Sequence, residues 1–459
     1  MRLKKLTHAG LSINTYLLID EKTHLAVAVD PTREIVPVIE ALQLEKAKLM
    51  YILETHVHAD FVSGAKELKH YFKEASQILC SAEGGEEWIP SYADVKVRDQ
   101  EIIEIGSLKL QAWHVPGHTP EHLMWVVFET TNDSSYPILA FTGDFLLTGS
   151  LGRPDLLGES KSRELAEKMH HSVFHTLFQF PDSMIILPAH GAGSFCGKSI
   201  SGKSETSLGE EKHSNPYLNR IDKTHWIENM IDQTSPAPSY FARLKQLNVK
   251  GATITQATPL AEAEDAQAEF LVDIRNPEVF AKGHLPGSIN IPYGPLFAKW
   301  AGELLPHNLP ILLIGKTIDI IQKAELDLRI LGLDNFKGYI LEDKIPKEKS
   351  ISFELAAPKT VNKEKPFVID VRTDEEWDEG HISGALHIPL QTLSQELSKI
   401  PKEQEIVITC GSGYRSSIAV SILEKNGFQN VASLNGGMQA WKNAGLDVEL
   451  GFWTKIKFF

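Results

Sequence analysis

Residues 52–64 read ILETHVHADFVSG, and this stretch decides how the first half of the chain is interpreted. A short apolar segment predicts a buried strand, which ends directly in His56, His58 and Asp60. Imidazole and carboxylate groups bind transition metals, and strand ends are where an α/β scaffold places such groups. The sequence therefore predicts a metal site here. The next residue, Phe61, cannot donate a lone pair, although the pattern leads one to expect another ligand.

The composition is that of a globular protein with several domains. The chain has 459 residues, a length for which roughly two to four domains are expected. The formal net charge of −14 disfavours nucleic acid and anionic membranes as partners, since both attract basic patches. The apolar runs are shorter than the roughly 20 residues needed to span a bilayer, and none resembles a signal peptide. Three sparse cysteines argue against a disulfide framework, so we expect a reducing cytoplasmic location.

The first part of the chain, residues 1–235, alternates strand-like and helix-like segments and predicts an α/β domain. The expected strands lie within residues 12–20, 25–31, 49–54, 108–117, 122–129, 136–144 and 183–191, and the expected helices within residues 33–45, 61–72 and 216–233. The polar segment 198–215 predicts a surface loop, and Pro- and Ser-rich residues 233–241 predict a linker.

The remainder contains an internal repeat. VDIRNPEVFAKGHLPGSINIP at residues 272–292 matches IDVRTDEEWDEGHISGALHIP at residues 369–389 without a gap. Each copy continues with a strand, a loop and a helix, so the repeat predicts two β/α modules of about 100 residues. We expect these modules at residues 240–345 and 352–459.

Candidate ligands recur along the first domain after apolar strands. One His-x-His pair means little in a chain with 18 histidines, but the recurrence at strand ends favours one shared site. The candidates are His56, His58, Asp60, His118, Asp144 and His190.

This arrangement resembles the metallo-β-lactamase superfamily over residues 1–235. The resemblance implies an αββα sandwich with a metal site at one edge. In two-metal members, the residue after the first aspartate is a histidine that binds the second metal. Because Phe61 stands there in this chain, we expect one metal rather than two.

Within the superfamily, the segments HADFVSG, GRPDLLG and PAHGAGSFCGK are similar to those of persulfide dioxygenases fused to rhodanese modules. The resemblance implies one Fe(II) per chain, held by His56, His118 and Asp144. Two imidazoles and a carboxylate suit non-haem Fe(II) and leave positions open for O₂ and substrate. Zinc accepts the same ligands, so the sequence alone leaves it as the less favoured alternative.

Other residues near this site have more than one interpretation. The resemblance implies that His58, Asp60 and His190 orient the ligands or hydrogen-bond to bound water and substrate, although His58 could also be a ligand. Residues 152–158, GRPDLLG, form either a loop held by Arg–Asp pairing or a wall of the substrate entrance. Cys196 could relay sulfur, or it could be a packed thiol.

The last module carries TCGSGYRSS at residues 409–417. Cys410 lies between a strand and a helix, where backbone N–H groups and the helix dipole stabilise a thiolate. Gly411 and Gly413 let the backbone approach the sulfur, and Arg415 adds positive charge. The Cys-x₄-Arg loop is one residue shorter than the Cys-x₅-Arg loop of protein phosphatases, which suits a single persulfide sulfur.

This module resembles rhodanese over residues 352–448, including its NGGMQAW segment. The resemblance implies that Cys410, assisted by Arg415, accepts a sulfane sulfur and passes it to sulfite. In the preceding module, Gly315 aligns with Cys410 and no cysteine is present, so that copy is predicted to be inactive. We expect it to serve as an interdomain wall or a dimer surface, with a framework salt bridge between Asp273 and Arg275.

The two resemblances suggest a persulfide dioxygenase that oxidises a small thiol persulfide with O₂ to sulfite and thiol. Rhodanese transfer would then convert sulfite to thiosulfate, which would detoxify sulfide. The thiol could be glutathione, coenzyme A or a similar carrier, and the family implies a homo-oligomer. One alternative is a zinc-dependent thioester hydrolase of the glyoxalase II type with an attached sulfurtransferase. The other is a non-enzymatic persulfide carrier or sensor.

Overall fold

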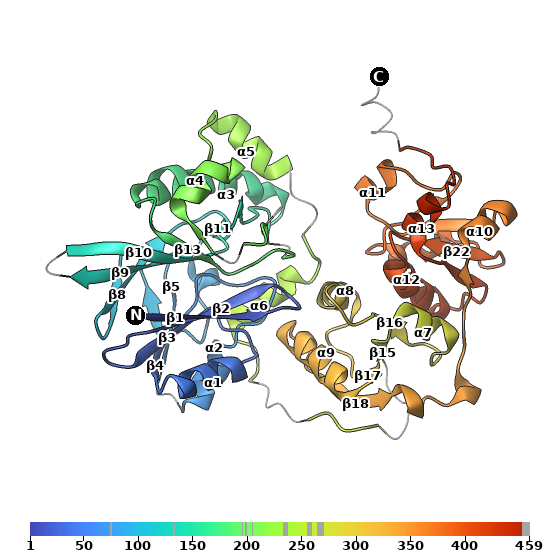
Figure 1. The fold of residues 1–459 in the computed structure, drawn as a ribbon, viewed down its shortest axis with the longest axis horizontal. Coiled ribbons are helices and arrows are strands. Elements are labelled where there is room, and N and C mark those ends of the chain that lie inside the picture. The colour runs from blue at the N-terminus through green and yellow to red at the C-terminus, as the bar shows by residue number, and fades with distance from the viewer. Residues whose placement is uncertain are drawn as a thin grey trace. The chain divides into compact units, whose positions relative to one another are not determined.

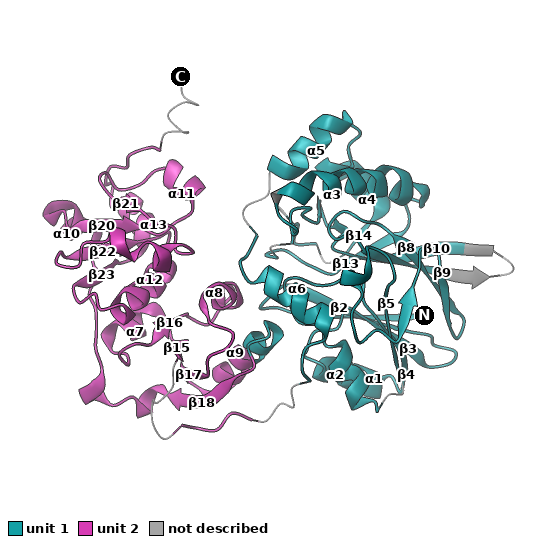
Figure 2. Cartoon of the chain, turned by 180° about the vertical axis from the view of Figure 1, so that it is seen from behind, with its two compact units in different colours: residues 1–257, 326–333 teal, residues 258–325, 334–459 magenta. Residues whose placement is uncertain are grey.

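The structure, a computed structural model, describes residues 1–73, 76–131, 134–194, 196–197, 200–203, 205–232, 237–254, 259–263 and 270–451. The chain forms two compact units, one of residues 1–257 and 326–333, the other of residues 258–325 and 334–459 (Figure 2). The domain ends predicted at residues 235 and 459, and residues 233–236 of the predicted linker, lie outside the described residues. The predicted domain boundaries stay predictions.

The first unit contains two six-stranded sheets. The first sheet consists, in spatial order, of β1 (Arg2–His8), β2 (Ile13–Ile19), β3 (Leu25–Val29), β4 (Lys48–Leu53), β5 (Gln77–Ser81) and β6 (Val95–Val97). The second consists of β14 (Thr206–Ser207), β13 (Ile185–Pro188), β10 (Ser134–Gly143), β9 (Leu123–Thr131), β8 (Leu108–His114) and β7 (Ile102–Ile105). β11 (Leu146–Leu147) and β12 (Ser150–Leu151) pair as a short antiparallel two-stranded sheet.

Each sheet is covered by helices on its outer face, which confirms the predicted αββα sandwich (Figure 1). Apolar residues of both sheets, such as Leu18 and Trp125, form one shared core between the sheets. The first sheet's outer face packs on α1 (Val36–Leu44) and α2 (Ala65–Tyr71). The second sheet packs on the helices α3 (Glu159–His171), α4 (Leu208–Ser214) and α5 (Lys223–Asp232). A further helix, α6 (Phe241–Lys250), ends the first long segment of this unit.

Two local predictions differ from the structure. The segment 198–215 is not a loop throughout, because β14 and α4 occupy residues 206–214. The Ser207 hydroxyl accepts the Glu210 N–H at 3.2 Å, and the Glu210 side chain accepts the Ser207 N–H, which is a capping box that starts α4. The capping box was not recognised in the sequence because the residues around it are polar, and a polar segment predicts a loop. The helix expected within 61–72 begins only at Ala65, because residues 61–64 continue the loop that follows β4.

The second unit contains two mainly parallel sheets, one for each repeat. The first repeat contains β15 (Phe270–Asp273), α7 (Pro277–Lys282), β16 (Ile289–Asn290), α8 (Phe297–Leu304), β17 (Ile311–Gly315), α9 (Ile318–Ile330) and β18 (Phe336–Leu341). The second repeat contains β19 (Leu355–Ala356), α10 (Pro358–Glu364), β20 (Phe367–Asp370), α11 (Asp374–Asp378), β21 (Leu386–His387), β22 (Ile406–Thr409), α12 (Tyr414–Lys425), β23 (Val431–Leu434) and α13 (Gly437–Asn443).

The strand register confirms the internal repeat. Asp273 pairs with Ile314 in the first copy, and Asp370 pairs with Thr409 in the second. Gly315 and Cys410 each follow these strand positions, as the alignment of the two copies predicts.

The ion pair predicted between Asp273 and Arg275 is present at 2.5 Å, and Asp370 binds Arg372 of the second copy in the same way at 2.6 Å. Among the described residues, no helix is both long and apolar enough to cross a membrane.

Candidate metal centre and cysteine loop

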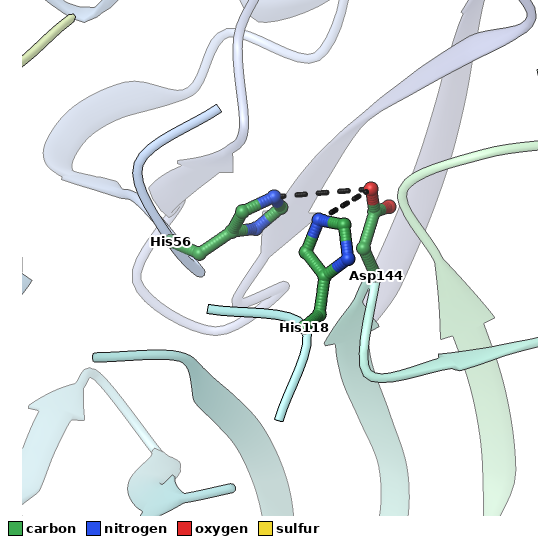
Figure 3. Close-up of side chains that lie close together, drawn as sticks. All are labelled: His56, His118 and Asp144. Atoms are coloured by element: carbon green, nitrogen blue, oxygen red, sulfur yellow. Dashed lines mark ion pairs between the residues drawn. The ribbon is translucent and has the colours of Figure 1, made fainter. Parts of the chain in front are cut away.

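Three of the predicted ligands converge at one end of the sandwich. They follow β4, β8 and β10, so three separate strands bring His56, His118 and Asp144 together. The Nε2 atoms of His118 and His56 lie 3.4 Å and 3.8 Å from Asp144 Oδ2 (Figure 3). A single cation bound at the usual distance of about 2.0–2.2 Å from nitrogen and oxygen ligands fits within such a triangle.

Hydrogen bonds orient both imidazoles toward this triangle. Nδ1 of His118 lies 2.9 Å from the Arg153 carbonyl oxygen. Nδ1 of His56 lies 2.9 Å from the Thr55 hydroxyl, which in turn donates to Asp30 Oδ2 at 2.8 Å. A proton on each Nδ1 leaves the Nε2 lone pair for a metal, which is the arrangement that outer hydrogen bonds impose on metal-binding histidines.

The atoms that face the triangle lack other partners. His56 Nε2 and both carboxylate oxygens of Asp144 are buried and have no hydrogen-bond partner among the described residues. Burial and the neighbouring histidines hold the pKa of His56 well below its usual range, so the ring stays neutral. Unpaired buried polar atoms are unfavourable unless they bind something, so this donor set fits a metal cation.

Asp60 and His190 form an ion pair beside the triangle. His190 Nε2 lies 3.1 Å from Asp60 Oδ2 and 3.5 Å from Asp144 Oδ1. Burial lowers the pKa of His190, but the carboxylates of Asp144 and Asp60 outweigh burial and raise it to about 9. Cys196 lies close enough to Asp60 and His190 that the three side chains could hold one metal ion together. Burial, followed by Asp144 and Asp60, raises the pKa of the Cys196 thiol.

His58 points to a different cluster. Its Nε2 lies 3.2 Å from Asp30 Oδ1 and 3.4 Å from Glu54 Oε2. Its ring packs on Phe61, with ring centroids 4.1 Å apart, and Phe61 is fully buried. The place where the sequence pattern leads one to expect another ligand is therefore filled by an apolar ring, and His58 forms a charged cluster with two carboxylates.

Three further residues beside the site were not predicted from the sequence: His122, Asp30 and Glu54. His122 stacks on His56 with centroids 4.7 Å apart, and its Nε2 accepts the backbone N–H groups of Asp144 and Phe145 at 3.1 Å and 3.2 Å. It thus fixes the turn that presents the Asp144 carboxylate. The signal was available, because all three residues lie at a strand end or in the His118 loop.

Both interpretations of the GRPDLLG segment have support. Arg153 and Asp155 form two hydrogen bonds of 2.6 Å each, so ion pairing holds this loop. Leu156 and Leu157 line a small pocket together with Val57 of the metal-ligand loop. The segment therefore also forms part of an apolar wall close to the candidate metal centre.

The cysteine loop is held by backbone contacts. The Gly413 N–H donates to Cys410 Sγ at 3.1 Å, and Gly413 has a φ of 103°, a conformation that favours glycine. The Cys410 carbonyl oxygen accepts the Met438 N–H at 2.7 Å. A Cβ on Gly437 would lie 2.4 Å from that same carbonyl oxygen. The NGGMQAW segment therefore approaches the loop as only a glycine backbone can.

Arg415 is anchored beside the cysteine. Its two Nη atoms each donate to a carboxylate oxygen of Glu376 at 2.6 Å. Glu376 also belongs to the capping box of Thr373 at the start of α11. The arginine is therefore presented in a fixed orientation, with part of its charge neutralised.

In the first repeat, the loop equivalent to the cysteine loop is packed with apolar side chains. A Cβ added at Gly315 would lie 2.7 Å from Ile321 Cγ1 and 3.3 Å from Ile274 Cδ1. Isoleucine side chains thus fill the space in which a sulfur atom would lie.

Comparison with known proteins agrees with this structure. The metallo-β-lactamase superfamily profile matches residues 10–190, and the rhodanese-like domain profile matches residues 256–341 and 355–444. The chain belongs to the metallo-β-lactamase superfamily and carries two rhodanese-like domains. The predicted family and fold class are therefore confirmed.

Individual relatives extend the comparison. Over 228 residues the chain is 31% identical to human "Persulfide dioxygenase ETHE1, mitochondrial", which covers 49% of this chain and 78% of the relative. Over 223 residues it is 30% identical to "Hydroxyacylglutathione hydrolase GloC" of Haemophilus influenzae, covering 45% of this chain and 92% of that protein. A crystal structure of a metallo-β-lactamase from Staphylococcus aureus matches with 30% identity and a TM-score of 0.68, covering 74% of this chain and 98% of that one. Together these matches support an enzyme with sulfur-related activity.

Proposed function

We propose that the chain is a persulfide dioxygenase whose product, sulfite, is converted to thiosulfate by its own rhodanese loop. The observation that carries the proposal is the triangle of His56, His118 and Asp144, with Phe61 filling the place where a further ligand is expected. The similarity to human persulfide dioxygenase and the two rhodanese-like domains support the same assignment.

The triangle fits one Fe(II) ion. Two neutral imidazoles and one carboxylate are typical ligands of non-haem Fe(II), and zinc is the alternative occupant. Bound there, iron would supply the redox chemistry between O₂ and the terminal sulfur of the persulfide. The overall reaction is RSSH + O₂ + H₂O → RSH + SO₃²⁻ + 2H⁺, in which R is glutathione, coenzyme A or a similar carrier.

The surrounding residues have separate tasks. Arg153 and Thr55 hold the ligand imidazoles in one orientation through His118 Nδ1 and His56 Nδ1. His190, which lies 3.1 Å from Asp60 and 3.5 Å from Asp144, is placed to contact bound water or substrate beside the ligand triangle. Leu156 lines a small pocket together with Val57, the residue after His56, and would form part of an apolar wall next to that ligand.

Cys410 performs the second step. The Cys410 thiolate first takes the terminal sulfur of a second RSSH molecule, which breaks that S–S bond and releases RS⁻. Sulfite then attacks the outer sulfur of the Cys410 persulfide, so the S–S bond of thiosulfate forms, the cysteine S–S bond breaks, and the Cys410 thiolate results. The Gly413 N–H, at 3.1 Å from Sγ, stabilises this thiolate, and Arg415 attracts the sulfite dianion. Joining both activities in one chain raises the effective concentration of sulfite near the acceptor loop.

A thioester hydrolase is the second candidate, because GloC is 30% identical over 92% of its own length. In superfamily members with two metals, a histidine stands at the position of Phe61. In this chain that position holds Phe61, and His58 faces Asp30 and Glu54 instead of the ligand triangle. Both observations support a one-metal dioxygenase over a two-metal hydrolase.

Oxygen uptake separates these functions. Anaerobically purified, iron-loaded protein is mixed with glutathione persulfide, and dissolved O₂, sulfite and thiosulfate are recorded. We expect O₂ consumption with about one iron per chain. Thioester cleavage without O₂ consumption would refute the dioxygenase in favour of the hydrolase, and the absence of both activities would favour a persulfide carrier. A Cys410→Ser variant should still consume O₂ but release sulfite in place of thiosulfate.

A further inference from the structure

The loop that carries His56, His58 and Asp60 is held by residues outside the superfamily match at 10–190. This loop leaves β4 and enters α2, and its backbone is buried. Buried N–H and C=O groups require partners, and in a loop these cannot come from a strand ladder. Some of these partners, such as Glu121 for the Val57 N–H, come from within the superfamily match, and others come from α6 and from the end of α9.

Asn248 of α6 satisfies three backbone groups of the loop. Its Nδ2 donates to the carbonyl oxygens of His58 and Phe61, both at 2.7 Å. Its Oδ1 accepts the Ser63 N–H at 2.9 Å. The Asn248 side chain is nearly fully buried, with 2% exposure. An amide side chain offers two donor hydrogens and one acceptor oxygen, so this one residue matches all three groups.

The end of α9 holds the same loop from another side. The Val62 N–H donates to the Ile330 carbonyl oxygen at 2.8 Å. The fully buried Ile330 side chain packs with Phe61 and Ile13 in one apolar cluster. Gly332 follows with a φ of 68°, and a Cβ there would lie 3.1 Å from Val62 Cγ2, so the turn after α9 fits closely against the loop.

Further hydrogen bonds join these parts into one network. Arg243 of α6 donates from Nη2 to the Leu331 carbonyl oxygen at 2.7 Å. Arg33 donates from Nη1 to the Arg329 carbonyl oxygen at 3.1 Å and from Nε to Glu67 of α2 at 3.0 Å. Residues 326–333 therefore belong to the same compact unit as the metal-ligand loop, although the rhodanese-like profile covers them.

We propose that Asn248 and the end of α9 are positioning elements of the metal centre, and that residues 326–333, which the rhodanese-like profile covers, are thereby a structural part of it. Without Asn248, two buried carbonyl groups and one N–H group would lose their partners, and the loop would move to find others. Such movement shifts His56 relative to His118 and Asp144. The inference rests on the proposed metal centre, but one of its tests does not require metal.

The first test compares metal retention in two full-length variants. Asn248→Ala removes the three loop contacts, whereas Asn215→Ala is a matched control from the same unit. Asn215 is fully buried and bonds to Ser150 O, Glu211 Oε2 and the Tyr217 N–H at 3.1, 2.9 and 3.1 Å. Each protein is loaded with Fe(II), and release to a chelator is timed under anaerobic conditions.

We expect release from Asn248→Ala to be about tenfold faster than from the wild type, the lower end of the loss that is typical when a direct partner of a metal ligand is removed, because Asn248 acts through the loop backbone. The Asn215→Ala protein should release iron at about the wild-type rate. Equal rates in the Asn248→Ala and wild-type proteins, or an equal acceleration in both variants, would overturn the positioning role.

The second test uses metal-free protein and hydrogen exchange. Asn248→Ala should make the Ser63 amide exchange faster, and Asn215→Ala should not. If Asn248→Ala does not fold, Ile330→Val provides a milder change, which should accelerate exchange at Val62. Unchanged exchange at Ser63 or Val62 in these variants would overturn the inference. A wild-type chain that binds no metal would refute the proposed centre, and exchange alone would then decide the positioning role.

Discussion

The ion pairs of His8 give a stability prediction with a defined sign. His8 ends β1, and its Nδ1 lies 2.8 Å from Glu34 Oε2 while its Nε2 lies 3.0 Å from Asp327 Oδ1. Burial lowers the pKa of His8, but Asp327 and Glu34 outweigh burial and raise it to about 9. A histidine in an unfolded chain titrates near 6.5, so the folded chain keeps a proton that the unfolded chain has lost.

The stabilisation is therefore fully present below about pH 6.5 and is lost as the pH rises through about 9. A difference of about 2.5 pH units corresponds to at most about 3 kcal/mol of unfolding free energy for the first unit. A His8→Gln variant should lose this pH-dependent part of the unfolding free energy, because a glutamine side chain does not titrate. Because the carboxylate of Asp327 is nearly buried, with 4% exposure, the variant should also be less stable at acidic pH.

Hydrogen exchange of the β1 amides that pair with β2 reports the opening of this unit. We expect wild-type protection to fall between about pH 6 and about pH 10, after correction for the intrinsic exchange rate, and the His8→Gln protein to show a much smaller change. An equal pH dependence in both proteins would refute the reasoning, as would a His8 titration midpoint near 6.5 in the folded chain.

Three other substitutions test separate parts of the structure. Asp370→Ala leaves its arginine partner buried without a carboxylate, and should destabilise the second unit by about 3–5 kcal/mol in urea unfolding; a loss below about 1 kcal/mol would contradict this. Glu376→Gln weakens the pair that anchors Arg415, so thiosulfate formation should fall about tenfold while O₂ uptake is unchanged. Phe61→His places an imidazole near His190 and Asp60, where two-metal superfamily members carry a ligand, so the iron content should rise above about one per chain, and an unchanged content would contradict the role given to Phe61.

Much of the first domain was predictable from local patterns. Apolar runs such as residues 49–54 and 183–191 became β4 and β13, because a buried strand needs a continuous apolar sequence. The strand ends indicated a shared site, but the choice of His56, His118 and Asp144 among six candidates came from the family resemblance. The ungapped repeat likewise predicted two copies of one β/α module, which the strand register confirms.

Other features depend on contacts between distant parts of the chain. The orientation of His58 is set by Asp30, Glu54 and the ring of Phe61, and no sequence spacing specifies the direction of a side chain. Asn248 lies 190 residues from the His58 carbonyl group that it binds, so no local pattern marks it. The capping box at residues 207–210 is a different kind of miss, because its signal was local and was masked by polar neighbours.

The packed interior behind Gly315 has a consequence for the history of the two copies. A cysteine introduced there would push its side chain into Ile321 and Ile274, so one codon change could not restore sulfur chemistry to this module. Restoring it would require a change at Ile321 as well as at Gly315. The two copies of the module therefore differ in the substitutions that they tolerate, because the packing around Gly315 now depends on the absence of a side chain there.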